Sequence, residues 1–150
     1  MLKKIIIIAI SLAAAGAAGW YLSNLVHDKA VTPEELPAKA QSFIDGHFSG
    51  TSVAFCKQDR DFLKVSYEAI LTDGTKLEFR HDGEWKEIDM HHARIPDGII
   101  PKEVTSKILE LYPDSFVTKA ERDSRELEVE LDNRLDLKFD RRNNLIGIDR

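Results

Sequence analysis

The chain has 150 residues, 43% of them hydrophobic and 31% charged, a composition typical of a folded globular protein rather than a disordered one. Its formal net charge of -5 argues against nucleic acid as a partner, because binding to phosphates requires clustered lysine and arginine. A chain of this length forms one compact domain, or two small subdomains that share a core.

The N-terminal segment differs in composition from the rest of the chain. Two lysines lie near its start, residues 5–18 carry no charge, and small residues gather at 15–19. This order is the signature of a secretory signal peptide, which we expect to comprise residues 1–19. The alternative is an uncleaved anchor that ends near residue 26, since about 20 apolar residues can span a membrane. Both predict a periplasmic or secreted protein, attached to the membrane only if the segment is not cleaved.

Residues 20–33 show no periodicity, which predicts a tether between this segment and the folded domain. The one cysteine, Cys56, excludes an intrachain disulfide. It lies in an apolar run, so we expect a buried thiol that acts as a small hydrophobic side chain. A catalytic cysteine would need an activating neighbour, and the sequence identifies none.

Two segments with the same proline-containing start predict helices. Residues 36–48 begin with Leu36-Pro37, and residues 100–112 begin with Ile100-Pro101. Proline is tolerated in the first turn of a helix, and the apolar residues of the first segment share one face. Apolar positions of the two halves match one another, both within these helices and in the strands that follow. We therefore expect two copies of one structural unit.

Each helix is followed by alternating apolar and polar residues, which predict half-buried antiparallel strands. Asp73-Gly74 predicts a two-residue hairpin turn, because glycine and aspartate accept the positive φ that such a turn requires. Asp82-Gly83 predicts a second turn. In the second half, 132–134 and 142–144 take these places, and asparagine tolerates left-handed backbone well enough to preserve the turn.

The expected fold class is α+β, with two tandem repeats of one helix packed on a four-stranded antiparallel sheet. The domain covers residues 34–149 and consists of repeat one, 34–92, and repeat two, 98–149. One helix covers a single face of four strands. The opposite face is then either solvated or a binding surface.

Several short motifs follow one another in a recognisable order: Leu36-Pro37, Tyr67-Glu68, Asp73-Gly74, Phe79, residues 82–89, Ile95-Pro96, Ile100-Pro101 and Tyr112-Pro113. Together they resemble the PepSY-like family of beta-lactamase-inhibitor-like proteins, over roughly residues 34–149. The resemblance implies an exported protein with a beta-lactamase-inhibitor-like fold and no assigned catalytic activity. The namesake inhibitor binds an enzyme with its sheet. No motif here matches its contact residues, so the resemblance does not identify a target.

Residues 81–92 contain three of the five histidines and raise the question of a metal site. Zinc requires three or four converging ligands. His91 and His92 are adjacent, so on a strand their side chains point to opposite faces. His81 lies before the turn, and no recognised ligand spacing is present. We expect neither a metal site nor a cofactor.

The same stretch supplies Glu84, Glu87 and Asp89 as candidates for acid–base catalysis. Such catalysis requires burial that raises the pKa of one carboxyl group, which turns and outward strand positions do not usually provide. Nucleophile motifs and phosphate-binding loops are absent from the sequence. We therefore expect a protein that is not an enzyme. Trp85 matches Leu145 in the second half, which favours a core position over a role in partner binding.

The outward positions of the strands are the better candidates for function. We expect the following residues to bind a partner: Lys64, Glu68, Lys76, Glu78, Arg80, Glu126, Glu128, Glu130 and Lys138. The alternative role of each residue is solubility alone. The outward residues of the second half are mainly acidic, which predicts a basic partner and binding that salt weakens.

The sequence thus predicts an exported, non-enzymatic binding module that recognises a protein or peptide through its sheet face, as an inhibitor or regulator. The alternative is an envelope protein that binds a small ligand or a metal ion in a pocket between the repeats. A deep apolar pocket with converging polar groups would favour this alternative, and a broad, shallow sheet face would favour the binding module.

Overall fold

The structure is a computed structural model of the chain and describes residues 26–61 and 64–150. The segment expected as a signal peptide, 1–19, and most of its extension as an anchor lie outside the described residues. Within the described ranges, no helix combines the length and the apolar character needed to cross a membrane.

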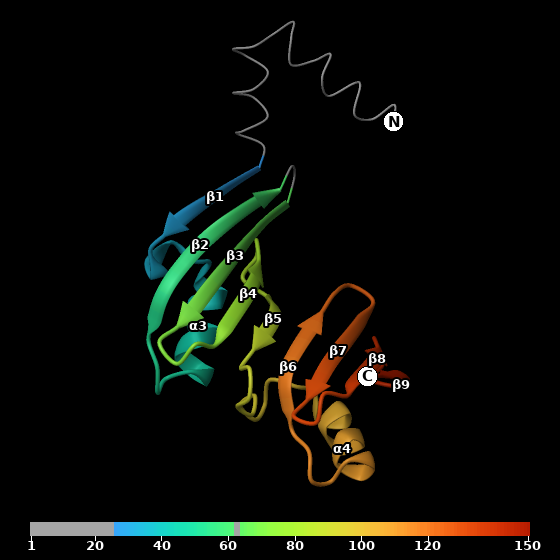
Figure 1. The fold of residues 1–150 in the computed structure, drawn as a ribbon. Helices are drawn as coiled ribbons and strands as arrows, with labels where there is room; N and C mark the ends of the chain where they lie inside the picture. Colours follow the sequence, from blue (N-terminus) through green and yellow to red (C-terminus); the bar gives the residue numbers. More distant parts are fainter. Residues whose placement is uncertain (1–25, 62–63) are drawn as a thin grey trace, which may run out of the picture.

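The described elements alternate short helices with runs of strands (Figure 1). In chain order they are β1 (Val26–Val31), the 3-10 turn η1 (Pro33–Glu35), α3 (Ala38–His47), β2 (Val53–Asp61), β3 (Lys64–Leu71), β4 (Lys76–Arg80), β5 (Trp85–Asp89), α4 (Lys102–Leu111), β6 (Val117–Arg122), β7 (Glu126–Leu131), β8 (Asp136–Asp140) and β9 (Leu145–Asp149).

All the described strands belong to one nine-stranded sheet, in which each strand pairs antiparallel with its neighbours in the sequence (Figure 1). The expectation of two tandem repeats, each with one helix on its own four-stranded sheet, is wrong. β5 pairs directly with β6, where Ile88 lies opposite Ala120, and β1 adds a strand beside β2. Unpaired backbone groups at a strand edge favour such pairing, which joins the two expected sheets into one.

Strand β1 lies within residues 20–33, which were expected to form a tether. Its residues pair with β2 from Val26 opposite Asp61 to Val31 opposite Cys56. Val31 is half-buried and packs against the core, whereas Asp28 and Lys29 are exposed. In the sequence of this segment, the alternation of apolar and charged residues is too weak to predict a strand.

The turn at Asp73-Gly74 joins β3 to β4 as predicted, but its loop has three residues rather than two. The backbone N–H of Leu71 donates to the carbonyl of Thr75 at 2.9 Å, and the N–H of Gly74 donates to the carbonyl of Leu71 at 3.0 Å. The third loop residue, Gly74, has a φ of +89°. Three-residue hairpin loops commonly consist of a type I turn followed by one residue in the left-handed conformation.

Three other hairpins, β4–β5, β7–β8 and β8–β9, repeat the same hydrogen-bond pattern, with Gly83, Arg134 and Asn143 in the position of Gly74. Their φ values are +83°, +65° and +63°. The expectation that asparagine preserves the last turn is therefore confirmed.

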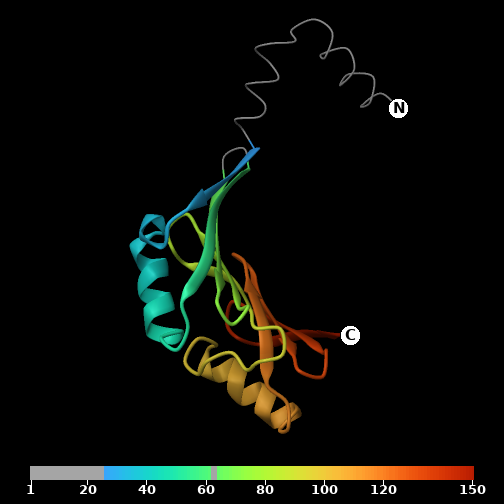
Figure 2. The same cartoon turned by 60° about the vertical axis from the view of Figure 1, so that its left-hand side comes forward.

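Both predicted helices are confirmed, as α3 and α4. Pro37 and Pro101 lie immediately before the first helical residues. Each helix buries two residues on the face toward the sheet, including Ile44 in α3 and Ile108 in α4. Figure 2 shows the two helices on the same side of the sheet.

A row of residues in direct cross-strand register crosses the face that the helices cover, and we call it the helix-face row: Cys56, Ala69, Leu77, Ile88, Ala120, Val129, Leu137 and Ile148. Every member except Ile148 is at most 2% exposed. The hydrophobic core is therefore continuous from β2 to β8. The opposite face, which we call the open face, is covered by none of the described helices.

Gly83 brings the turn between β4 and β5 against the start of α3. A Cβ atom on Gly83 would lie 2.9 Å from the Cβ atom of Lys39 and 3.0 Å from that of Pro37. The corresponding atom on Gly74 would meet nothing closer than 3.9 Å. The absence of a side chain at Gly83 therefore allows close packing of the turn on the helix, in addition to the positive φ.

We predict that Gly83→Ala destabilises the protein more than Gly74→Ala does. Both substitutions introduce left-handed strain of about 1–2 kcal/mol. Gly83→Ala adds about 1–3 kcal/mol, because the new methyl group overpacks the contact with α3. Urea denaturation of both variants measures the free energy of unfolding. Equal losses in the two variants would contradict a role for the close approach.

Candidate functional site

The open face carries a line of glutamates that crosses five adjacent strands. Each member lies directly opposite the next, and we call the line the glutamate row: Glu68, Glu78, Glu87, Glu121 and Glu128. Lys57 lies opposite Glu68 at one end, and Lys138 lies opposite Glu128 at the other. The row spans the pairing between β5 and β6, so it exists only because the sheet is continuous.

Like charges directly opposite each other on neighbouring strands destabilise a sheet. On β3 to β6, lysines offset this repulsion. The amino group of Lys76 lies 3.0 Å from a carboxylate oxygen of Glu78, and that of Lys119 lies 3.4 Å from Glu87. Lys86 also contacts Glu78, at 3.0 Å. Burial acts to raise the pKa of Glu78, but its hydrogen bonds with the two lysines hold this pKa below the ordinary value.

The open face is less well compensated over β6 to β8. Lys138 contacts Asp149 at 3.0 Å and Glu128 at 3.6 Å. Among the described residues, no lysine or arginine forms an ion pair with four other carboxylates of this region: Glu121, Glu126, Glu130 and Asp136. This part of the face therefore has an excess of negative charge.

The structure places the residues predicted to bind a partner on the open face, as strand alternation requires. Glu68, Glu78 and Glu128 belong to the glutamate row, and Lys76 and Lys138 are its counter-charges; the other predicted residues are Lys64, Arg80, Glu126 and Glu130. Lys64 lies at the start of β3, away from the row. The guanidinium group of Arg80 donates to the carbonyl of Arg122 at 2.9 Å, so it also has a structural role.

Sequence reasoning missed the place of Glu87 and Glu121 in this surface. Glu87 was weighed as a catalytic carboxylate, and Glu121 was not considered. The two residues are opposite each other only because β5 pairs with β6. Alternation within each strand indicates which residues point outward, but it does not indicate which strands are neighbours.

Trp85 lies in the core, as predicted, with 6% of its surface exposed. The guanidinium group of Arg122 covers its ring at 4.1 Å from the ring centre and donates from Nε to the Trp85 carbonyl at 2.8 Å. Nη2 of Arg122 also donates to Glu84 at 2.5 Å, and Lys39 of α3 pairs with the other oxygen of Glu84. We call Lys39, Glu84, Trp85 and Arg122 the junction cluster, since it joins α3, β5 and β6.

The junction cluster argues against acid catalysis by Glu84. Hydrogen bonds from Lys39 and then Arg122 hold the pKa of Glu84 below the ordinary value, although burial acts in the opposite direction. A general acid needs a raised pKa. Glu84 is therefore ionised at neutral pH, and its contacts indicate a structural role.

The three histidines of residues 81–92 do not form a metal-binding group. His81, His91 and His92 are exposed, and Nε2 of His91 lies 3.1 Å from the carbonyl oxygen of Gly74. Within the described ranges, no group of three His, Cys, Asp or Glu side chains is placed to hold a metal ion. Cys56 is 2% exposed, and burial raises the pKa of its thiol, as expected for a core cysteine.

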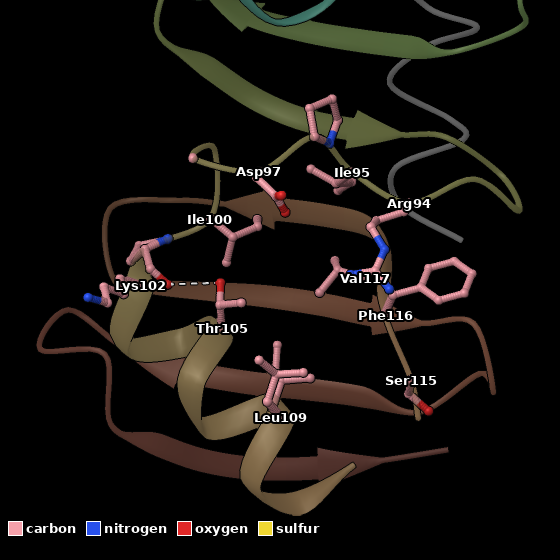
Figure 3. Close-up of a pocket in the computed structure, with 14 residues that line it drawn as sticks. Arg94, Ile95, Asp97, Ile100, Lys102, Thr105, Leu109, Ser115, Phe116 and Val117 are labelled. Carbon is pink, nitrogen blue, oxygen red and sulfur yellow. Dashed lines mark hydrogen bonds between the residues drawn. The ribbon is translucent and has the colours of Figure 1, made fainter. Parts of the chain in front are cut away.

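A groove lies on the side of the sheet that carries the helices, between α4, β6 and the segment that precedes α4 (Figure 3). It has a volume of about 550 Å³ and a largely apolar lining that includes Ile95, Ile100 and Leu109. Two of its polar side chains have contacts with neighbouring groups: the Thr105 hydroxyl donates to the carbonyl of Pro101 at 3.2 Å, and Arg94 stacks on Phe116 at 5.0 Å. The largely apolar lining offers few polar groups to orient a small ligand.

We predict that Glu84→Gln lowers the free energy of unfolding by about 1 kcal/mol at neutral pH. Because the folded-state pKa of Glu84 is depressed, its contribution is present above the ordinary pKa and is lost as the pH falls through the folded-state value. The difference between the two proteins should therefore close in acid. Urea titrations from pH 7 to about pH 3 measure it. Glu110→Gln, at a carboxyl that is 65% exposed, is the matched control and should change stability by less than about 0.5 kcal/mol. A pH-independent difference for Glu84→Gln would contradict the assignment.

Solved structures of Bacteroides proteins match this chain closely. One from Bacteroides thetaiotaomicron, described as a "putative calcium-regulated periplasmic protein", is 46% identical, with a TM-score of 0.80, over 82% of this chain and 97% of that one. A "putative periplasmic protein" from Bacteroides vulgatus is 37% identical, also with a TM-score of 0.80, over 82% and 97%. Another from Bacteroides vulgatus, described as of unknown function, is 32% identical, with a TM-score of 0.80, over 83% and 100%.

A search of curated proteins gave no match. A family model described as "putative beta-lactamase-inhibitor-like, PepSY-like" matches residues 65–147, which include β5, β6 and the whole glutamate row. The resemblance inferred from the short motifs is thereby confirmed. The chain belongs to the PepSY-like family of beta-lactamase-inhibitor-like proteins.

Proposed function

We propose that this chain is an exported, non-enzymatic binding module that holds a basic protein or peptide against the open face of its sheet. The observation that carries the proposal is the excess of carboxylates over β6 to β8, on a face that none of the described helices covers. An uncompensated charged surface attracts a partner of opposite charge and restricts the choice of partner.

Three further observations support this proposal. The family description refers to an inhibitor, which suggests inhibition or regulation of the bound partner. Similar structures are described as periplasmic proteins, consistent with export. Two of the candidate catalytic groups are in environments unsuited to catalysis, since Glu84 is held ionised and Cys56 is buried.

The alternative is a small-ligand or metal-binding protein of the envelope. The groove beside α4 is large enough for a ligand, but it lies beside one helix rather than between the halves of the sheet, and its lining is largely apolar. The calcium-regulated description belongs to the Bacteroides thetaiotaomicron protein. On this chain the glutamate row is the surface that a cation would approach, yet Glu78 and Glu87 already have lysine partners.

The open face is tested by capture from native envelope extract with the purified protein as bait. The triple variant Glu126→Gln, Glu128→Gln and Glu130→Gln removes negative charge from β7. We expect the wild-type chain to retain a basic partner at ~0.05 M salt and to release it at ~0.5 M salt, because screening weakens exposed charge interactions. The triple variant should bind that partner about tenfold more weakly or worse.

The matched control changes three exposed carboxyl groups away from the open face: Asp97→Asn, Glu110→Gln and Asp114→Asn. It alters net charge by the same amount and should retain the partner. Retention that is insensitive to salt, or equal losses in the two triple variants, would contradict binding through the open face.

A calcium titration separates the binding module from the metal-binding alternative. We expect ~1 mM calcium chloride to leave the melting temperature unchanged. Extracellular calcium modules bind calcium at about 0.1–1 mM through converging oxygen ligands, so this concentration would raise the melting temperature of a protein with such a site. A rise in melting temperature that Glu87→Gln abolishes would favour the metal-binding alternative. Differential scanning calorimetry with magnesium chloride at the same ionic strength provides the control.

A further inference from the structure

Strand β9 stands in the same relation to β8 as β5 does to β4. In the first pair, Leu77 lies opposite Ile88; in the second, Leu137 lies opposite Ile148. Both pairs have a register shift one residue after these positions, before Phe79 and Phe139 respectively. The free side of β9 can therefore be compared with the side of β5 that is occupied.

The occupied side of β5 is covered by β6. Ile88 lies opposite Ala120, and Asp89 lies opposite Lys119. Among the described strands, β9 pairs only with β8 and is an outer strand of the sheet. The edge of β5 that faces away from β4 therefore pairs with β6, whereas the equivalent edge of β9 pairs with none of the described strands.

The unpaired edge leaves apolar surface exposed. Ile148 belongs to the helix-face row and is 45% exposed, whereas Ile88, at the equivalent place, is 0% exposed. Ile146, in the same strand, is 57% exposed. The outer strand at the other side of the sheet differs, because β1 exposes Asp28 and Lys29. Charged residues protect an edge strand from pairing with other chains, and β9 combines one exposed charge, Asp149, with two exposed isoleucines.

Backbone groups on this edge are directed outward. The N–H of Met90 donates to the carbonyl of Thr118 at 3.0 Å. Met90 and Thr118 therefore form a hydrogen-bonded pair. Such pairs recur at every second residue of an antiparallel ladder, so Ile88 and Ala120, two residues further along, also form one. At the equivalent position, the N–H and C=O groups of Ile148 point away from β8 and are available to a further strand.

The pairing of β5 with β6 also indicates which strand chemistry fits. A small side chain, Ala120, accommodates Ile88 on the helix face, and a cation, Lys119, lies opposite Asp89. On β9 the corresponding carboxylate is Asp149, which lies opposite a second carboxylate, Asp136. Lys138 is the single lysine paired with Asp149 among the described residues. A basic residue opposite Asp149 would therefore be favoured.

We propose that β9 is a docking edge, which an extended segment of a partner protein joins as an additional antiparallel strand. The bound segment has a small apolar residue opposite Ile148 and a basic residue immediately before it, opposite Asp149. Main-chain hydrogen bonds supply affinity in this mode of recognition, and alternate side chains supply specificity. This docking uses the backbone edge of β9 and does not depend on a partner that binds across the open face.

The experiment uses the isotope-labelled protein, recovered from the envelope, and the synthetic peptide Val-Thr-Lys-Ala-Glu-Arg, which has the sequence of β6. We expect the peptide to shift the NMR signals of the β9 amides and to slow hydrogen exchange at Ile148. Methylation of the backbone nitrogen of the peptide's alanine removes one donor and should weaken binding about tenfold. Ile148→Glu should weaken binding at least as much.

Leu109→Glu is the matched control, because Leu109 is 49% exposed but lies on α4, and it should bind the peptide like the wild type. The methylated peptide provides a test that does not depend on the folding of any variant. Three results would overturn the proposal: no change at β9 up to millimolar peptide, equal binding of the methylated peptide, or concentration-dependent self-association that Ile148→Glu abolishes. The last result would identify a second copy of this chain as the occupant of the edge.

Discussion

The pairing of β5 with β6 is the constraint on which the rest of the structure depends. It is short, with Ile88 opposite Ala120 at its centre, yet it turns two helix-covered sheets into one. The helix-face row becomes a single core, and the glutamates of both halves fall into one line. The junction cluster supports this pairing, because Arg122 of β6 stacks on Trp85 and binds Glu84 beside β5. Since both faces take their continuity from this pairing, the hydrophobic core and the charged surface are linked.

Features that depend on neighbouring residues could be predicted from the sequence. Both helices follow their prolines, and the hairpins occur where Gly74, Gly83 and Asn143 accept a positive φ. The position of β1 could not be predicted, because its pairing with β2 depends on residues far away in the chain. The union of the two sheets was missed for the same reason: hydrophobic patterns indicate which side of a strand is buried, but they contain little information about the neighbour at its edge.

The candidate site shows the same limit. The outward position of Glu78 and Glu128 follows from alternation alone, and both residues were identified. Their membership in one line with Glu87 and Glu121 depends on the register of three strand pairings. Cys56 could be assigned to the core because it lies in a local apolar run, and Trp85 because it matches an apolar residue, Leu145, in the second half. The lysine contacts that offset repulsion along the row required the three-dimensional positions of Lys76 and Lys119.

The order of the strands in the sheet is the same as their order in the sequence, which has a consequence for folding. No strand has to insert between two strands that are already paired. Six of the eight pairings are made between strands joined without a helix, and the other two span α3 and α4. Contacts between residues close in sequence form quickly, because little chain entropy is lost in closing the loops between them. A chain that becomes available from its N-terminal end could therefore add each strand to the growing sheet as it emerges, without waiting for a later segment.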